Sequence, residues 1–516
     1  MTPPTAGHPP AARGRAILGL VIAGAALVVI DMTIVTIALP AIQADLGGTL
    51  AGIQWVIIGY MITMGAVTQV VGSLSDRIGR RRIYLLGIAL FTASSLVCGA
   101  APTTTLLDLA RAVQGIGGAI LMVNALPLLS QHLEGERRNM AISTWGSAAT
   151  AASLIAPLLG GALVDTLSWR AIFLINIPIG VTAFVICLRT LPADVSGRTA
   201  HGRIDWAGTA LLIVSLALAN LALLRGEDQG WGSAATLTQL TVAAVLLAAF
   251  LLLQSRAGAP TLDVALFRRP AFTGAALAVF ISRVLTIGGT VYFVQYFQGS
   301  LHLNPTQSGL LLTPVFLAQM AAGMLGGKLL SRFPSGHVIA SGYACKAVGA
   351  TLLALAFTPT ISPWLLTVPL LIWGIGGGIA GAPVMAVAMN VTDEERAGMV
   401  AGTITSLASI GAGIGTAVLG AIYTTRIADI VATGPSLPAA SREAVIAAAA
   451  NGDIQRVLDL TPATARATIE DLLSNAIASG ASAVLYSSAG LAVITIALVL
   501  TLIGKRDLPQ PAASGQ

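Results

Sequence analysis

Long apolar blocks, separated by short polar segments, run through almost the whole of this chain. Each block is about 20 residues long, the length that a helix needs to cross roughly 30 Å of hydrocarbon. The first block, at residues 16–39, is too long for the apolar core of a signal peptide. The pattern predicts fourteen membrane-spanning helices, at residues 16–39, 53–74, 83–100, 106–131, 140–163, 171–191, 206–224, 235–254, 272–298, 307–330, 338–357, 364–390, 399–423 and 481–503.

Two short motifs recur in the two halves of the chain. Residues 72–77 (GSLSDR) are echoed by residues 327–332 (GKLLSR), and residues 115–120 (GIGGAI) are echoed by residues 374–379 (GIGGGI). Internal repeats that flank a site near the membrane midplane are typical of secondary transporters. The repeats therefore predict that the chain contains two related halves.

The predicted architecture is an all-α membrane protein with two pseudo-symmetric six-helix bundles. The first bundle covers residues 1–191, and the second covers residues 272–516. Residues 192–271 supply two inserted helices with their linkers. Within the second bundle, residues from about 425 to 480 are predicted to form a long external loop before the last helix, partly helical by pattern at residues 441–451 and 461–476.

The composition supports a membrane location. Hydrophobic residues make up 55% of the chain and charged residues only 10%, whereas soluble domains carry about 25% charged residues. Arginine and lysine gather in the loops after the even-numbered predicted helices and are scarce in the other short loops. Because cytoplasmic loops are enriched in these residues, we expect a multi-pass protein of the bacterial plasma membrane with both termini in the cytoplasm.

Several function classes lack the residues that they need. The three cysteines, Cys98, Cys187 and Cys345, lie in apolar blocks without metal or disulfide spacing. The nearest approach to a phosphate-binding loop, residues 327–329 (GKL), has no Ser or Thr after the lysine. No basic patch with interleaved aromatic residues is present. We therefore expect no enzyme activity, no ATP-driven pumping, no metal or other cofactor and no nucleic-acid partner.

The loop after the second predicted helix combines glycines, an aspartate and arginines. Gly72 allows two helices to approach closely, and Gly79 permits a tight turn. Asp76 can face the positive end of a helix. On its charges alone the loop could be a membrane-orientation anchor, but the spacing resembles the corresponding loop of the major facilitator superfamily. That resemblance implies a conformational gate at Gly72, Asp76, Arg77, Gly79 and Arg80.

Further motifs narrow the resemblance to the fourteen-helix drug/proton antiporters. Residues 31–40, 107–117 and 169–180 resemble signature motifs of that family, and residues 156–161 (APLLGG) resemble its helix 5 antiporter motif. The family usually has glycine where this chain has Ala156, but the kink-forming proline and the close-packing glycine pair are present. The resemblance implies proton-coupled export and adds to the gate Pro157, Gly160 and Gly161.

Charged side chains inside a bilayer cost at least about 2.5 kcal/mol each, so they are functional candidates by default. Asp31 lies deep in the first predicted helix, and Arg111 belongs to a family motif whose arginine is linked to proton transfer. Burial favours a protonated carboxyl group and a nearby arginine favours an ionised one, so we predict that both residues take part in proton coupling. The structural alternatives are a hydrogen bond of Asp31 near the helix end beside Thr33, and a pair between Arg111 and Asp108.

Two more basic residues, Arg283 and Lys346, lie in predicted helices of the C-terminal half and outside the family motifs. They would make a substrate cavity basic, which favours neutral or anionic amphiphiles, and either could also orient Asp31. Gln295 and Gln298 are further candidates for the cavity lining. Alternatively, the basic side chains extend to the membrane surface or pair at a helix interface, and the glutamines join helices by hydrogen bonds.

Together these features predict a proton-coupled secondary active exporter, an antiporter that moves small lipophilic compounds such as antibiotics or drugs by alternating access. Its partners would be the small-molecule substrate, protons and membrane lipids, and we expect it to function as a monomer. Two alternatives remain open. One is a proton-coupled importer of a small metabolite, and the other is a non-transporting sensor on a transporter scaffold.

Overall fold

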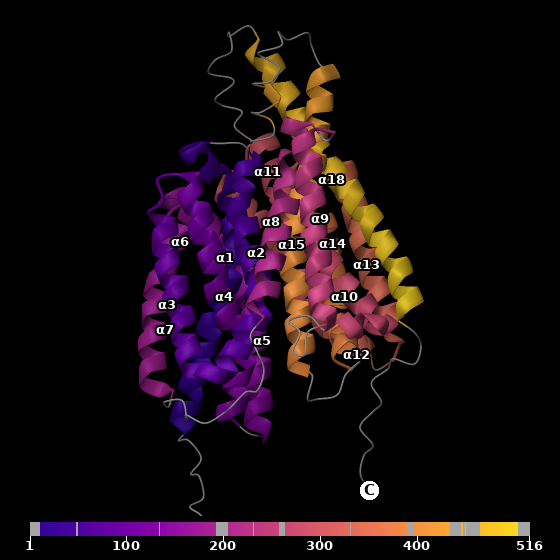
Figure 1. Ribbon diagram of the computed structural model, residues 1–516. Coiled ribbons are helices and arrows are strands. Elements are labelled where there is room, and N and C mark those ends of the chain that lie inside the picture. The colour runs from indigo at the N-terminus through magenta and orange to yellow at the C-terminus, as the bar shows by residue number, and fades with distance from the viewer. Residues whose placement is uncertain are drawn as a thin grey trace, which may run out of the picture.

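The architecture is a bundle of long helices. The computed structural model describes residues 11–47, 50–133, 135–191, 205–230, 232–256, 264–330, 332–390, 397–433, 445–446, 449 and 465–503. Within these ranges the chain is helical and has no β-strand, and most helices run along one common direction (Figure 1). This confirms the all-helical class that the apolar blocks predict.

The helices fall into three runs along the sequence. The first run, the N-terminal group, holds α1 (Ala11–Leu46), α2 (Leu50–Ile78), α3 (Arg80–Gly99), α4 (Thr104–His132), α5 (Gly135–Thr166), α6 (Ala171–Leu174) and α7 (Asn176–Thr190). The second run holds α8 (Trp206–Gln229) and α9 (Ala234–Arg256). The third run, the C-terminal group, holds η1 (Val264–Arg268), α10 (Pro270–Arg283), η2 (Val284–Gly288), α11 (Gly289–Gln295), η3 (Tyr296–Ser300), α12 (Pro305–Leu329), α13 (Ser335–Ala356), η4 (Pro363–Leu366), α14 (Thr367–Asn390), α15 (Ala397–Thr433) and α18 (Arg466–Leu502).

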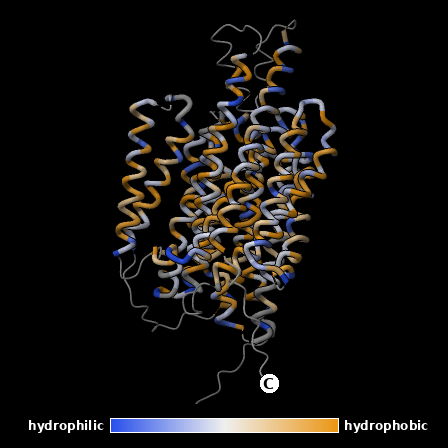
Figure 2. The backbone as a smooth tube through the Cα atoms, turned by 90° about the vertical axis from the view of Figure 1, so that its right-hand side faces the viewer, coloured by the Kyte–Doolittle hydropathy of each residue, from blue (hydrophilic) through white to orange (hydrophobic). Residues whose placement is uncertain are grey.

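Most of these helices have the dimensions of membrane spans. In the described part of the chain, thirteen helical runs are long and apolar enough to cross a membrane. The second predicted span is represented by a shorter apolar stretch, Gly52–Thr68, within α2. Hydrophobic residues line the helices over most of their length, and hydrophilic residues gather mainly near the two ends of the bundle (Figure 2).

The predicted external loop at about 425–480 is shorter than expected, because helices occupy both of its ends. Helix α15 continues to Thr433, and α18 begins at Arg466. The two extensions pack on each other, and their apolar side chains at helical spacing are fully buried, as Ile427 and Ile477 illustrate. Burial of this apolar stripe explains why the helices extend beyond the main apolar blocks. Most of the remaining loop lies outside the described residues.

The bundle has two ends, which we name by residues. The Asp45 end, at the top of Figure 1, holds the last turn of α1 and the first turns of α2, α4 and α12. The Arg80 end, at the bottom, holds the first turns of α3, α5 and α13. The final residues of α18 also lie at the Arg80 end.

Each helix group packs on itself, and the groups meet mainly along two helix pairs. Helix α4 packs on α2 and α3, and α14 packs on α12 and α13. Between the groups, α2 packs on α15 and α5 packs on α12. Hydrogen bonds also cross between the groups, from Gln54 to Tyr292 at 2.9 Å and from the Thr306 amide to Asp165 at 2.8 Å. Both bonds lie in the parts of the helices toward the Asp45 end.

The hairpin of α8 and α9 covers this junction from one side. Helix α8 contacts both α2 and α15, whereas α9 exposes large apolar side chains that include Leu237, Val245 and Leu252. The hairpin lies at the left edge of Figure 2 and is largely hydrophobic in colour. An exposed apolar face of this extent is suited to contact with lipid.

Glycines allow the closest approach between the groups. A Cβ atom on Gly309 of α12 would lie 2.8 Å from the carbonyl carbon of Pro157 in α5. A Cβ atom on Gly161 of α5 would lie 2.6 Å from the Cα atom of Thr306. Small residues at such positions let helix backbones pack directly in a membrane. The α5–α12 junction therefore depends on the absence of side chains.

We predict that Gly309→Ala destabilises the protein by about 1–3 kcal/mol, because the new methyl group has to displace the backbone of α5. Gly327→Ala on the same helix is the control, since a methyl group there meets no atom within 4 Å and alanine favours the helix. Thermal unfolding in detergent compares both variants with the parent. An apparent Tm of Gly309→Ala that equals or exceeds that of Gly327→Ala would contradict the close contact.

Candidate functional site

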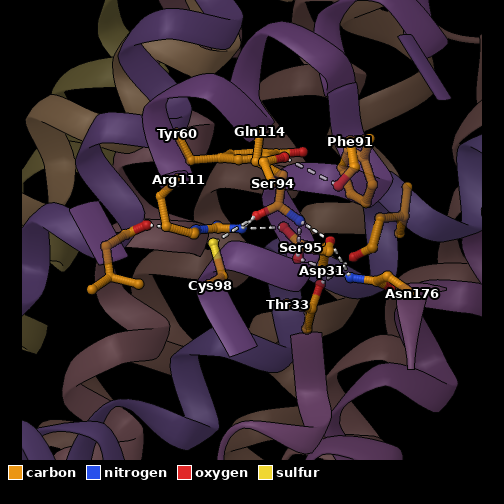
Figure 3. A network of polar contacts seen from close by, with 12 residues as sticks. Asp31, Thr33, Tyr60, Phe91, Ser94, Ser95, Cys98, Arg111, Gln114 and Asn176 are labelled. Carbon is orange, nitrogen blue, oxygen red and sulfur yellow. Dashed lines mark hydrogen bonds and ion pairs between the residues drawn. The ribbon is translucent and has the colours of Figure 1, made fainter. Parts of the chain in front are cut away.

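A buried carboxylate lies at the centre of the N-terminal group. Asp31, near the middle of α1, has 0% exposure. One of its oxygens accepts a hydrogen bond from the Arg111 guanidinium of α4, with which it forms an ion pair. The other oxygen accepts bonds from the Gln114 amide at 3.1 Å and from the Asn176 amide at 3.4 Å. Both carboxylate oxygens are thus satisfied without water (Figure 3).

The guanidinium of Arg111 also has several bonding partners besides Asp31. Nε of Arg111 donates to the backbone carbonyl of Val56 in α2 at 2.8 Å, and Nη1 donates to Oε1 of Gln114 at 2.8 Å. The guanidinium carbon lies 4.2 Å from the ring centroid of Tyr60 and 5.7 Å from that of Phe173. The backbone bond, the amide bond and the aromatic contacts fix the guanidinium beside Asp31.

Amide and hydroxyl groups extend the site to the neighbouring helices. Gln114 also donates to the hydroxyl of Ser95 in α3 at 2.7 Å, and Asn176 of α7 donates to the same hydroxyl at 3.2 Å. Cys98 of α3 donates to Oε1 of Gln114 at 3.7 Å. The network joins side chains from α1, α3, α4 and α7, while α2 supplies a carbonyl group to it. A change in charge at Asp31 would therefore act on five helices at once.

Glycines of α4 bring the neighbouring helices close enough for this network to form. A Cβ atom on Gly117 would lie 2.8 Å from the backbone nitrogen of Phe91 in α3. A Cβ atom on Gly115 would overlap the carbonyl oxygen of Tyr60 in α2. The side chain of Arg111 has to reach a carbonyl group on α2. The glycines that follow it on α4 keep α2 and α3 close enough to α4 for this bond and the rest of the network.

The structure brings together the two residues singled out for proton coupling, although their role remains a prediction. The structural alternatives for Asp31 and Arg111 involve other bonds than the ones that the structure shows. Thr33 donates to the carbonyl of Val29 at 3.1 Å, and the ion pair that Arg111 forms in the described structure is with Asp31. Oδ1 of Asp108 is buried without a hydrogen bond among the described residues.

The sequence interpretation missed the amide partners of the ion pair. Gln114 lies in the motif at residues 107–117 and Asn176 in the motif at residues 169–180, but no site role is predicted for either from the sequence. Both are polar residues within strongly apolar spans, and Gln114 lies one helical turn after Arg111. An amide in an apolar span needs a hydrogen-bond partner, so this signal could have identified them.

Two residues of the loop gate, Gly72 and Arg80, contact α4 of their own group. Gly79 has φ of 114°, a conformation that favours glycine, at the junction of α2 and α3. Arg80 donates to the carbonyl of Pro127 in α4 at 3.0 Å. Gly72 lies opposite Val123 of α4, Arg77 is half-buried, and the side chain of Asp76 lies outside the described part of the structure. The gate role remains a prediction.

The helix 5 motif lies at two helix junctions. Gly160 faces Ile34 of α1, three residues after Asp31, while Gly161 and Pro157 face α12. The motif therefore connects the helix that carries the buried carboxylate with the junction between the two groups.

The candidates for the substrate cavity lie in the C-terminal group. Lys346 of α13 is 1% exposed, and its ammonium donates to hydroxyl groups of α10 and η2. Arg283, at the end of α10, is exposed. Gln298 donates to the carbonyl of Ile37 at 3.1 Å, whereas Gln295 is 1% exposed with no hydrogen bond to either amide atom in the described structure. Neither basic side chain contacts Asp31 in the described part of the chain.

Comparisons with known proteins identify relatives over most of the chain. Residues 21–416 match the model of the Major Facilitator Superfamily. The multidrug resistance protein Stp of Mycobacterium tuberculosis is 34% identical over 400 residues, which cover 77% of this chain and 74% of that protein. The tetracenomycin C resistance and export protein of Streptomyces glaucescens is 32% identical over 431 residues, which cover 82% of this chain and 79% of that protein.

A solved structure shares the fold. It is the crystal structure of a bacterial homolog of the human lysosomal transporter Spinster, in an inward-facing and unoccupied conformation. The TM-score is 0.68, and the match covers 98% of this chain and 100% of that chain. At 16% sequence identity the likeness concerns the fold alone.

We predict that Gln114→Leu destabilises the protein by about 1–3 kcal/mol, because it removes a donor to Asp31 and leaves Ser95 with one partner fewer. Gln131→Leu is the matched control, since Gln131 is an exposed residue of the same helix. Unfolding by SDS titration gives the midpoint for each protein. Equal midpoints for the two variants would show that the network contributes little to stability.

Proposed function

The chain belongs to the major facilitator superfamily, and from this premise we propose that it is a proton-coupled exporter of small lipophilic compounds. It is a multi-pass membrane protein, and the relatives that cover most of its length are named for multidrug resistance and for antibiotic resistance and export. Those names support export of a small molecule. The coupling to protons rests on the site.

The observation that carries the proposal is the ion pair between Asp31 and Arg111 in the interior of the helix group. A proton added to Asp31 would remove its negative charge and leave the arginine without a counter-charge. An unpaired charge at this depth is unfavourable by at least about 2.5 kcal/mol. The protonated site therefore favours another arrangement of α1 and α4, and this difference couples proton binding to helix movement.

The movement that we propose is a rocking of two six-helix bundles, at residues 1–191 and 272–516, about the junctions of α2 with α15 and of α5 with α12. Residues 192–271 contribute the inserted hairpin. We place the Arg80 end and both termini in the cytoplasm, on the basis of the Lys/Arg asymmetry. The hydrogen bonds between the groups toward the Asp45 end support a conformation that is closed to the outside and open to the cytoplasm.

The other gate residues act at the ends of this movement. Arg80 and its neighbours would exchange their contacts with α4 for contacts across the groups when the Arg80 end closes. Pro157 and Gly161 would separate from α12 when the Asp45 end opens, while Gly160 would keep its contact with α1. Both steps are transitions between packed states, as expected for alternating access.

The proton gradient is sufficient to drive such export. One elementary charge crossing the membrane releases about 2.3 kcal/mol per 100 mV, and each pH unit adds about 1.4 kcal/mol. A single proton can therefore support a substrate concentration ratio on the order of a hundredfold.

We predict that Asp31→Asn abolishes proton-driven uptake of a drug into everted membrane vesicles, because asparagine cannot exchange a proton. A susceptibility panel in an efflux-deficient bacterial host first selects the drug. Uptake by the parent should depend on an acidic vesicle interior and stop when a protonophore is added, and the variant should match vesicles that lack the protein.

The control is Asp45→Asn on the same helix. Asp45 forms an exposed pair with Arg170 at 2.5 Å, and exposed pairs contribute little to stability, so uptake should persist. Parental uptake by Asp31→Asn would reject the coupling role. Drug transport in the opposite direction would identify an importer, and drug binding without transport would identify a sensor.

A further inference from the structure

Two basic side chains in the C-terminal group have no acidic partner among the residues that the structure describes. Arg283 and Lys346 form no ion pair in the described structure, whereas Arg111 pairs with Asp31 and Arg170 pairs with Asp45. Basic residues inside a membrane usually pair with acids or carbonyl groups. A negatively charged ligand would therefore stabilise Arg283 and Lys346.

The ammonium group of Lys346 is held in place by neutral groups. It donates to the Thr286 hydroxyl at 2.9 Å and to the Ser282 hydroxyl at 3.3 Å. Its nitrogen lies 5.4 Å from the ring centroid of Trp373 in α14. Hydroxyl and aromatic groups stabilise a cation but do not neutralise it. The positive charge therefore remains available to a third group.

Arg283 directly follows Ser282, a hydroxyl partner of this ammonium, along the chain and is exposed. Phe280 and Val284 of the same helical run face α15, Ser282 faces α13, and Gly274 faces α18. With about 3.6 residues per turn, Arg283 falls on none of these three covered faces. Arg283 can thus meet a ligand while Lys346 adds a second charge behind it.

The backbone around the two cations is adapted to hold them. The π-helical segment η2 begins directly after Arg283 and contains Thr286, the closer hydroxyl partner of Lys346. Such segments are frequent at functional sites. On the opposite side, a Cβ atom on Gly376 of α14 would lie 2.8 Å from Cγ of Lys346. The glycine leaves the space that the lysine stem occupies.

We propose that Arg283 and Lys346 form a subsite for an organic anion, with a single negative charge on oxygen such as a carboxylate. The guanidinium contacts the anion, and the buried ammonium adds a second positive charge. The anion supplies the negative charge that no described residue gives to either cation. The subsite is separate from the proton site, because Asp31 interacts with Arg111 in the other helix group.

This inference rests on the proposed export function and specifies the class of substrate. The test is a fluorescence titration of the full chain in lipid nanodiscs with two probes, 1-pyrenebutyrate and its uncharged methyl ester, with empty nanodiscs as the blank. The parent should bind the acid more tightly than the ester. Arg283→Gln and Lys346→Met should each weaken binding of the acid by about tenfold or more and leave binding of the ester unchanged.

Two further variants separate charge recognition from a structural role. Arg283→Lys keeps the positive charge and should retain most of the preference for the acid. Arg332→Gln removes an exposed arginine at the end of α12 and should bind both probes like the parent. A parallel loss of acid and ester binding would indicate a structural role and overturn the proposal.

The remaining outcomes also decide the question. Equal binding of the two probes by the parent, or no binding of either, would overturn the anion subsite even if vesicles export drugs. A preference for the acid that disappears in both charge-removing variants would support the subsite even if the vesicle assay rejects export. The binding assay and the transport assay therefore test the two proposals independently.

Discussion

The ion pair between Asp31 and Arg111 is the constraint on which the N-terminal group depends. Two opposite charges in the buried interior of a helix group need each other, and they also need hydrogen bonds for their remaining atoms. Gln114, Asn176 and a carbonyl group of α2 provide those bonds. Five helices are consequently arranged around one carboxylate, and a proton at that carboxylate would disturb a larger set of contacts than a surface residue could reach.

Close packing through glycine is the second organising feature, and it serves two purposes. Within the N-terminal group, Gly115 and Gly117 hold α2 and α3 near α4, so that the polar network can close. Between the groups, Gly161 and Gly309 let α5 and α12 touch through their backbones. Lipid offers no hydrophobic driving force for such contacts, so they depend on van der Waals packing of small surfaces. Contacts of that kind can separate and form again without exposing polar groups.

The two groups differ in how they treat charge. In the N-terminal group the buried arginine has a carboxylate partner, whereas in the C-terminal group the buried lysine has hydroxyl groups and an aromatic ring. In the proposed mechanism the two sites have different roles. The site at Asp31 and Arg111 exchanges a proton, and the subsite at Arg283 and Lys346 binds the substrate.

The sequence by itself determined the helical class and the positions of the apolar helices, because hydrocarbon thickness and backbone hydrogen bonding restrict a membrane chain to few solutions. It also singled out Asp31 and Arg111, since a charge in an apolar span is conspicuous. Only the tertiary structure decided that these residues pair, that Gln114 and Asn176 complete the site, and that α15 and α18 extend into the expected loop. Those features arise from contacts between residues as much as 145 positions apart, and the spacing of residues along one helix carries no information about which face meets which neighbour.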